Sequence, residues 1–228
     1  MRQKIGGNTL RQIDSQLIRD KIVAVLRQEI LYGNFKPNQE LYQDRIAEEL
    51  NVSRMPVREA IQVLANEGLV NARPNKVATV NEVTDKFISD FFDVRILLEK
   101  EAVRRVCMRE GLDIAPLWNY YEQACHCIDI DDYKQYNEYN QKIHQFIWHA
   151  ADNIKLEQLL SQLWHTMYVG SYAKENAFCS NEGHRSIIQS IEDRNVEAAQ
   201  RATEAHLLFS LKNMRERRLH QKGIEGTP

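Results

Sequence analysis

The sequence predicts a mainly α-helical protein of two domains, and three observations support this prediction. Residues 40–68 have the pattern of two short amphipathic helices joined by a tight turn. Residues 69–80 have the pattern of a small β-hairpin. Residues 84–220 contain only three glycines and one proline, and helical periodicity dominates there. We therefore expect an N-terminal winged helix-turn-helix domain followed by a C-terminal all-helical bundle.

The N-terminal domain is expected to span residues 15–80, after a flexible stretch at residues 1–14. Apolar residues recur at helical spacing from 15 to 32, and Gly33 ends that helix. A loop follows at residues 34–38 and leads to the helix pair.

The second helix of the pair is the most informative element of this domain. Ser53 is a suitable N-cap, and the preceding Asn51 tolerates the left-handed backbone of a tight turn. Arg54 and Arg58 lie four residues apart on one exposed face at the helix start, which suits phosphate groups and guanine edges. The alternative is a solvated helix hairpin whose arginines pair with Asp44 or Glu59.

The hairpin after Gly68 makes the pair a winged helix. Its strands are expected near residues 69–72 and 77–80, with a turn at 73–76. Arg73 and Lys76 lie at the tip of this wing, where they could contact a sugar-phosphate backbone. An ordinary polar turn is the alternative.

The C-terminal domain is expected to span residues 81–220, with a flexible tail at 221–228. Its helices are predicted near residues 84–110, 113–129, 131–152, 154–176, 181–193 and 195–219. A bundle of this size can enclose an internal cavity.

Charge and composition exclude several classes of protein. Residues 1–80 hold 12 Lys and Arg against 9 Asp and Glu, whereas the remainder is acidic and the whole chain has a net charge of −2. No apolar run approaches the roughly 20 residues that a membrane helix needs, and the N-terminus lacks the apolar segment of a signal peptide. The four cysteines form no CxxC pair. These features predict a cytoplasmic protein with reduced thiols.

Three of the seven histidines could form a metal site with one amide. Asn140 and His144 are four residues apart on one helix, so both project from one face. His184 is expected at the start of the fifth helix of the bundle, and His206 lies midway along the sixth. Three imidazoles and an amide oxygen suit a divalent transition metal. However, spacing alone does not bring His144, His184 and His206 together, and isolated histidines are usually structural or surface groups.

These motifs together resemble the GntR family of bacterial transcription regulators. The N-terminal resemblance rests on residues 52–60 (VSRMPVREA) and 67–70 (EGLV). The C-terminal half is similar to the FadR-type subfamily, which carries an all-helical FCD domain, through residues 93–99 (DVRILLE), 182–184 (EGH) and 205–207 (AHL). Six helices suggest the shorter, VanR-like branch.

The resemblance implies a sequence-specific regulator, expected to be a repressor, that binds double-stranded DNA as a homodimer. Two-fold symmetry of the dimer implies a pseudo-palindromic operator. The expected DNA-binding residues are Arg45, Ser53, Arg54, Met55, Arg58, Arg73 and Lys76.

The resemblance also implies a metal held by the positions of Asn140, His144, His184 and His206. Zinc is the first expectation, with nickel or manganese as alternatives. A small carboxylate-type effector would bind beside the metal, and Arg95 would either line that cavity or pair with Glu99.

Three positions depart from the family pattern, and one of them is Asn38, which replaces the glycine that commonly follows the proline before the second helix. Asn140 stands where the family usually has aspartate, so the ligand set lacks that negative charge. Asn75 stands near the tip of the wing where glycine is usual, and asparagine still permits a left-handed turn.

Two rival functions remain open at this point. Histidines around a metal could activate water in an enzyme, but only Glu182 lies near them in sequence as a candidate base. Alternatively, the metal could be purely structural and hold the bundle closed.

Overall fold

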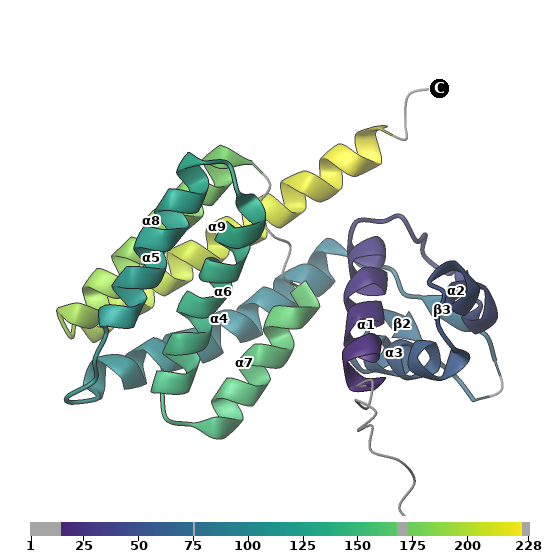
Figure 1. The fold of residues 1–228 in the computed structure, drawn as a ribbon, viewed down its shortest axis with the longest axis horizontal. Helices are drawn as coiled ribbons and strands as arrows, with labels where there is room; N and C mark the ends of the chain where they lie inside the picture. Colours follow the sequence, from purple (N-terminus) through teal and green to yellow (C-terminus); the bar gives the residue numbers. More distant parts are fainter. Residues whose placement is uncertain (1–14, 75, 168–172, 225–228) are drawn as a thin grey trace, which may run out of the picture. The chain divides into compact units, whose positions relative to one another are not determined.

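The computed structural model describes residues 15–74, 76–167 and 173–224, and these residues form two compact units (Figure 1). The first unit includes the chain up to Ile30 and Phe35–Glu82, and the second includes Leu31–Asn34 and the chain from Val83 onward. The predicted flexible stretch at residues 1–14, the end of the predicted tail at 225–228 and the wing position Asn75 lie outside the described residues.

The first unit is a winged helix. Its helices are α1 (Ser15–Leu31), α2 (Gln43–Glu49) and α3 (Arg54–Asn66). Its strands are β1 (Glu40–Leu41), β2 (Val70–Asn71) and β3 (Ala78–Val80), in the order β1-β3-β2 with both pairs antiparallel. The helix pair and the hairpin confirm the predicted pattern, whereas β1 was not predicted.

Local backbone geometry explains the tight turn between α2 and α3. Asn51 has a φ of 51°, and Gly68 after α3 has a φ of 77°, which are the left-handed conformations that these residue types tolerate best. Ser53 is the N-cap of α3 as predicted, but its side chain makes no capping hydrogen bond. The cap therefore contributes less than a bonded serine would.

The second unit is an all-helical bundle. Its described helices are α4 (Asp85–Met108), α5 (Ala115–Asp129), α6 (Tyr133–Ala150), α7 (Ile154–Met167), α8 (Lys174–Glu192) and α9 (Val196–Ile224). Side chains of Thr84 and Asp132 accept hydrogen bonds from the first turns of α4 and α6. Helix α9 packs along both α4 and α8, and α5 packs on α6 (Figure 1).

Three predicted helix boundaries were wrong. The predicted helix over 154–176 is described only to Met167, and α8 begins at Lys174 rather than at residue 181. His184 therefore lies in the middle of α8, not at its start. Helix α9 continues to Ile224, past the predicted end at residue 219. Within the described residues, no helix is long and apolar enough to cross a lipid bilayer.

Candidate metal centre and nucleic-acid interface

The start of α3 presents a polar and basic surface. The seven residues predicted to bind DNA are all exposed; they are Arg45, Ser53, Arg54, Met55, Arg58, Arg73 and Lys76. Nε of Arg54 lies 2.7 Å from Oδ1 of Asp44, and the Arg54 side chain is 66% exposed. Arg45 pairs with Glu49 in the same exposed manner. Exposed ion pairs contribute little stability, so a phosphate can replace these carboxylates.

Packing of α3 fixes the direction of that surface. This helix is amphipathic, as predicted, and its buried apolar side consists of Val57, Ala60, Ile61 and Leu64. At the other end of α3, the buried Glu67 carboxylate receives two hydrogen bonds from Arg27 of α1. A bidentate pair of this kind fixes the relative orientation of its two side chains as well as adding energy. The pair therefore anchors the end of α3 to α1.

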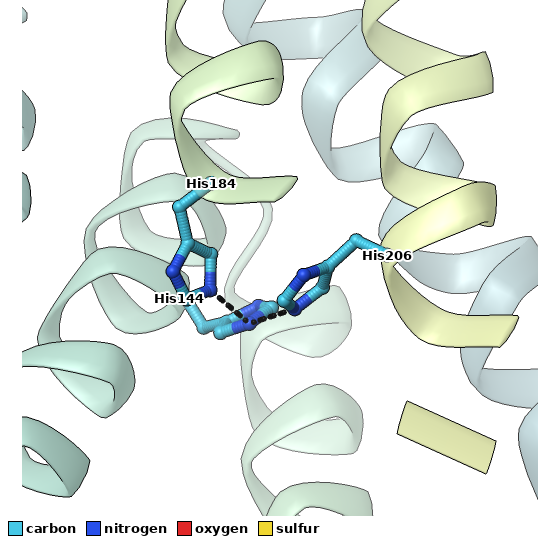
Figure 2. Close-up of side chains that lie close together, drawn as sticks. All are labelled: His144, His184 and His206. Carbon is cyan, nitrogen blue, oxygen red and sulfur yellow. Dashed lines mark hydrogen bonds between the residues drawn. The ribbon is translucent and has the colours of Figure 1, made fainter. Parts of the chain in front are cut away.

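Three helices of the second unit bring three histidines together. His144 comes from α6, His184 from α8 and His206 from α9, and all three are buried. Nε2 of His144 lies 3.3 Å from Nε2 of His184 and 3.3 Å from Nε2 of His206. Figure 2 shows the three rings pointing toward one another. Their nitrogens form a cluster with the spacing of metal ligands.

The spacing of these nitrogens fits a bound metal ion. Zinc lies about 2.0–2.1 Å from histidine nitrogen, so two ligands separated by 90° to 109° are about 2.8–3.4 Å apart. The separations of 3.3 Å between Nε2 of His144 and Nε2 of His184 and of His206 fall within that range. The triad therefore needs little rearrangement to hold a divalent ion.

Partners on the opposite ring nitrogens orient two of the imidazoles. Nδ1 of His144 lies 3.3 Å from Oε2 of Glu99, and Nδ1 of His184 lies 3.5 Å from Oδ1 of Asn181. Both oxygens can accept, so a ring with its proton on Nδ1 satisfies each of these contacts and turns the lone pair of Nε2 toward the cluster. Such outer partners fix the tautomer and raise the basicity of a ligand.

Glu99 is itself held by three side chains. Its Oε1 accepts from Arg95 at 3.0 Å, and its Oε2 accepts from Nε1 of Trp148 at 3.0 Å in addition to contacting His144. Burial would raise the pKa of Glu99, but His144 and Arg95 together hold that pKa well below its usual range. Glu99 is therefore an ionised carboxylate in the interior, balanced by the Arg95 guanidinium.

His184 and His206 are neutral at pH 7. Burial, and then the neighbouring His206, lowers the pKa of His184 well below its usual value. Burial, followed by His144, lowers the pKa of His206 to about 3. Neutral imidazoles are the form that binds metals.

The amide predicted as a fourth ligand is also in the interior. Asn140 is buried on α6, one turn before His144 and on the same face. The predicted effector residue Arg95 is buried and paired with Glu99, and its guanidinium lies 4.9 Å from the ring centroid of Trp164. The structure thus contains the Arg95–Glu99 pairing that the sequence left as one of two alternatives.

Histidines outside the triad have ordinary surroundings where the structure describes them. His149 is 82% exposed and contacts Glu157, and His126 is exposed as well. The side chains of His165 and His220 lie outside the described part of the chain.

Sequence reasoning missed several residues that shape the triad. Trp148 donates a hydrogen bond to Glu99, and the side-chain oxygen of Asn181 contacts Nδ1 of His184. Gly183 lets His206 approach α8, because a Cβ on this glycine would lie 2.7 Å from Nδ1 of His206. A glycine inside a helical pattern, next to a histidine, was the available signal.

Comparison with known proteins identifies both domains. Residues 18–80 match the model of the bacterial regulatory proteins of the gntR family, and residues 90–209 match the FCD domain. The HTH-type transcriptional regulator YdhC of Bacillus subtilis is 29% identical over 79% of this chain and 84% of its own length. The HTH-type transcriptional repressor RspR of Escherichia coli is 25% identical over 85% of this chain and 87% of its own length.

The fold has solved counterparts. The structure of Escherichia coli McbR/YncC superposes with a TM-score of 0.68 at 20% identity, covering 90% of this chain and 99% of that one. The regulator Lar of Listeria monocytogenes gives a TM-score of 0.60 at 19% identity, over 91% of this chain and 98% of its own. Because a gntR-type winged helix precedes an FCD domain along the sequence, the chain belongs to the GntR family and is a DNA-binding transcription regulator, not an enzyme.

Proposed function

We propose that this regulator is a repressor whose FCD domain binds a divalent transition metal and a small carboxylate effector. The observation that supports it best is the convergence of three buried Nε2 atoms at ligand spacing. Three imidazoles favour zinc, with nickel or manganese as alternatives. Relatives such as RspR are named repressors, which supports the sign of regulation.

DNA recognition is assigned to the exposed start of α3 in a homodimer. Two copies of α3 would enter successive major grooves of a pseudo-palindromic operator. We assign base contacts to Arg54 and Arg58, with Ser53 and Met55 beside them. Phosphate contacts are assigned to Arg45, Arg73 and Lys76, which would set affinity and salt dependence rather than sequence preference. Such a regulator acts in the cytoplasm, beside the chromosome.

Metal binding is assigned to His144, His184 and His206, with the amide oxygen of Asn140 as a fourth donor. A bound ion would supply a Lewis-acidic attachment point for a carboxylate oxygen. Glu99 and Asn181 would keep the ligand nitrogens aimed at the ion. Arg95 would act in this centre through Glu99, and its contact with an effector remains a prediction.

The domain boundaries follow from this assignment. We propose a DNA-binding domain at residues 15–80 and an effector, metal-binding and dimerisation domain at 81–220. The division of the described residues near Glu82 and Val83 supports the boundary.

The experiment starts from a random pool of duplex DNA, because the operator is unknown. The protein is used to select binding sequences, and the consensus should show two-fold symmetry. Bound metal is then measured in the wild type, in the double variant His184→Ala/His206→Ala and in the control His149→Ala. The double variant should lose the ion and the control should keep it. If the selected sequences share no common motif, the assignment of sequence-specific DNA binding is refuted. If all three proteins contain the same amount of metal, the metal site is refuted.

A structural metal is the second candidate, and the deep burial of the triad favours it. Chelation would then lower the thermal stability of the second domain without changing operator affinity or its response to carboxylic acids. Under the proposed function, chelation abolishes the response to the acid.

A further inference from the structure

The end of helix α9 lies beyond the part of the chain that matches the FCD domain. Helix α9 continues to Ile224, whereas the match to the FCD model ends at residue 209. Two arginines of this extension, Arg215 and Arg218, are three residues apart and therefore lie on one face of the helix. Both donate hydrogen bonds to other parts of the second unit.

Arg218 holds two parts of the chain that are far apart in sequence. Its Nη1 donates to the carbonyl oxygen of Leu31 at 3.0 Å, and its Nη2 donates to the carbonyl oxygen of Val83. Leu31 ends α1, where carbonyl groups lack partners within the helix, and basic side chains bond such carbonyls well. The planar fork of a guanidinium lets one side chain reach both acceptors.

The two acceptors lie where the chain passes between the two units. Leu31 directly follows the first passage from one unit to the other, and Val83 directly follows the last. Both residues are buried, and both belong to the second unit together with Arg218. One side chain of the second unit therefore holds that unit's own ends of two links to the winged helix.

A second arginine holds the end of α9 in place. Nη2 of Arg215 donates to Oγ of Ser89 in the second turn of α4. Leu211 and Met214 of α9 are buried, and α9 packs along α4. Arg218 thus reaches the two carbonyl groups from a backbone that is itself fixed to the bundle.

We propose that Arg218 is a positioning residue for DNA recognition, an inference that rests on the proposed homodimer and its two half-sites. Once one winged helix has bound its half-site, binding of the second is intramolecular, and its effective concentration depends on the stiffness of the links. Two fixed links restrict the places that the second winged helix can reach, so the dimer favours one spacing of half-sites. Without Arg218 both links gain freedom, and the preference for that spacing becomes weaker.

The test measures DNA affinity as a function of half-site spacing. The selected consensus is prepared as a duplex with its own spacing, as duplexes with one base pair added or removed between the half-sites, and as a single half-site. Gel-shift titrations compare the full-length wild type with Arg218→Gln, which lacks the fork of donors. The matched control is Arg201→Gln on the same helix, because Arg201 is exposed and pairs with Glu197.

The expected result separates positioning from reading of DNA. Arg218→Gln should bind the selected spacing about tenfold more weakly, which is part of the roughly 10²–10⁴-fold gain that linking two sites can give. The altered spacings should lose less affinity, so discrimination between spacings decreases. Affinity for the single half-site should equal that of the wild type, because the exposed start of α3 is unchanged. Arg201→Gln should behave as the wild type with every duplex.

Hydrogen exchange gives a second readout that needs no DNA. Backbone amides of residues 31–36 and 82–85 should exchange faster in Arg218→Gln than in the wild type or in Arg201→Gln. Unchanged exchange at both links would show that they are held without Arg218 and would overturn the inference.

Two outcomes of the DNA titrations would also overturn it. An unchanged preference for spacing in Arg218→Gln would show that the two carbonyl contacts do not position the winged helix. Equal losses for the single half-site and for every spacing would show damage to the reading domain instead. A wild-type consensus without two half-sites would refute the proposed homodimeric operator and the inference with it, and the selection reveals that outcome before any variant is tested.

Discussion

Replacing Glu99 by glutamine (Glu99→Gln) removes a buried negative charge and keeps the shape of the side chain. In the wild type this carboxylate accepts from Arg95 and Trp148 and contacts His144. Without it, the buried Arg95 guanidinium has lost its counter-charge. Breaking a buried pair from one side costs about 3–5 kcal/mol of folding free energy, and we expect a loss of that size at pH 7.

The same substitution should weaken metal binding. Glutamine can present its amide N–H₂ to Nδ1 of His144, which would allow the proton of that ring to move to Nε2 and block the ligand lone pair. Loss of such an outer partner typically reduces metal affinity about 10–100-fold. We expect a loss of zinc affinity in that range for Glu99→Gln.

Tryptophan fluorescence during urea unfolding measures the first effect. Trp118, Trp148 and Trp164 are the three tryptophans of the chain, and all lie in the second unit. The signal therefore follows the FCD domain without contribution from the winged helix, which matters because a two-domain chain need not unfold in one step.

The control is Glu101→Gln on the same helix. Glu101 also pairs with two arginines, Arg104 and Arg105, at 2.7 Å each, but all three side chains are more than a third exposed. Exposed pairs contribute about 0–1 kcal/mol, so this variant should lose at most that amount. Equal losses for the two variants would refute the argument that burial of the Arg95–Glu99 pair determines the cost.

Three further perturbations test other parts of the molecule. Burial lowers the pKa of His206 from 6.5 to about 3, so below pH 6.5 the unfolded chain binds a proton that the folded chain does not. The free energy of unfolding of the metal-free protein should therefore fall by up to about 1.4 kcal/mol per pH unit as the pH decreases from 6.5 toward 3. Urea titrations at several pH values should show a weaker dependence of this free energy on pH in His206→Gln than in the wild type, and the wild-type dependence in His149→Gln. Gly183→Ala places a Cβ 2.7 Å from Nδ1 of His206, so we expect about 1–3 kcal/mol of destabilisation from overpacking, and a rise in the unfolding midpoint would contradict this. Arg58→Ala should weaken specific operator binding by about 1–3 kcal/mol, whereas Lys76→Ala should weaken binding to all DNA and lower the salt slope by about one; gel-shift titrations at several salt concentrations distinguish the two.

The winged helix was largely predictable because its signals are local. The apolar stripe of α3, the turn at Asn51 and the position of Ser53 all lie within a few residues of one another. Strand β1 was missed because it has two residues and pairs Leu41 with Ala78, a partner far along the chain. No local pattern marks such a strand.

The histidine cluster was predictable only in part. The spacing of Asn140 and His144 placed both on one face of α6, but three imidazoles on three helices meet only after the bundle has packed. The resemblance to a family, not periodicity, selected these residues in advance. Helix α8 begins at Lys174, seven residues before the predicted start at residue 181, and Gly183 is a helix-interior glycine that makes room for His206.

The Arg95–Glu99 pair connects the stability of the bundle to the state of the metal centre. A buried ion pair seldom stabilises a protein more than apolar side chains of the same size would, so stability alone does not explain its presence. Its geometry does: Arg95 and Trp148 fix the carboxylate, and the carboxylate fixes the Nδ1 proton of His144. The ring then offers its Nε2 lone pair to the cluster before any ion binds. Replacing both Arg95 and Glu99 by apolar residues should therefore lower zinc affinity, and a double variant that retains full zinc affinity would show that His144 does not need Glu99.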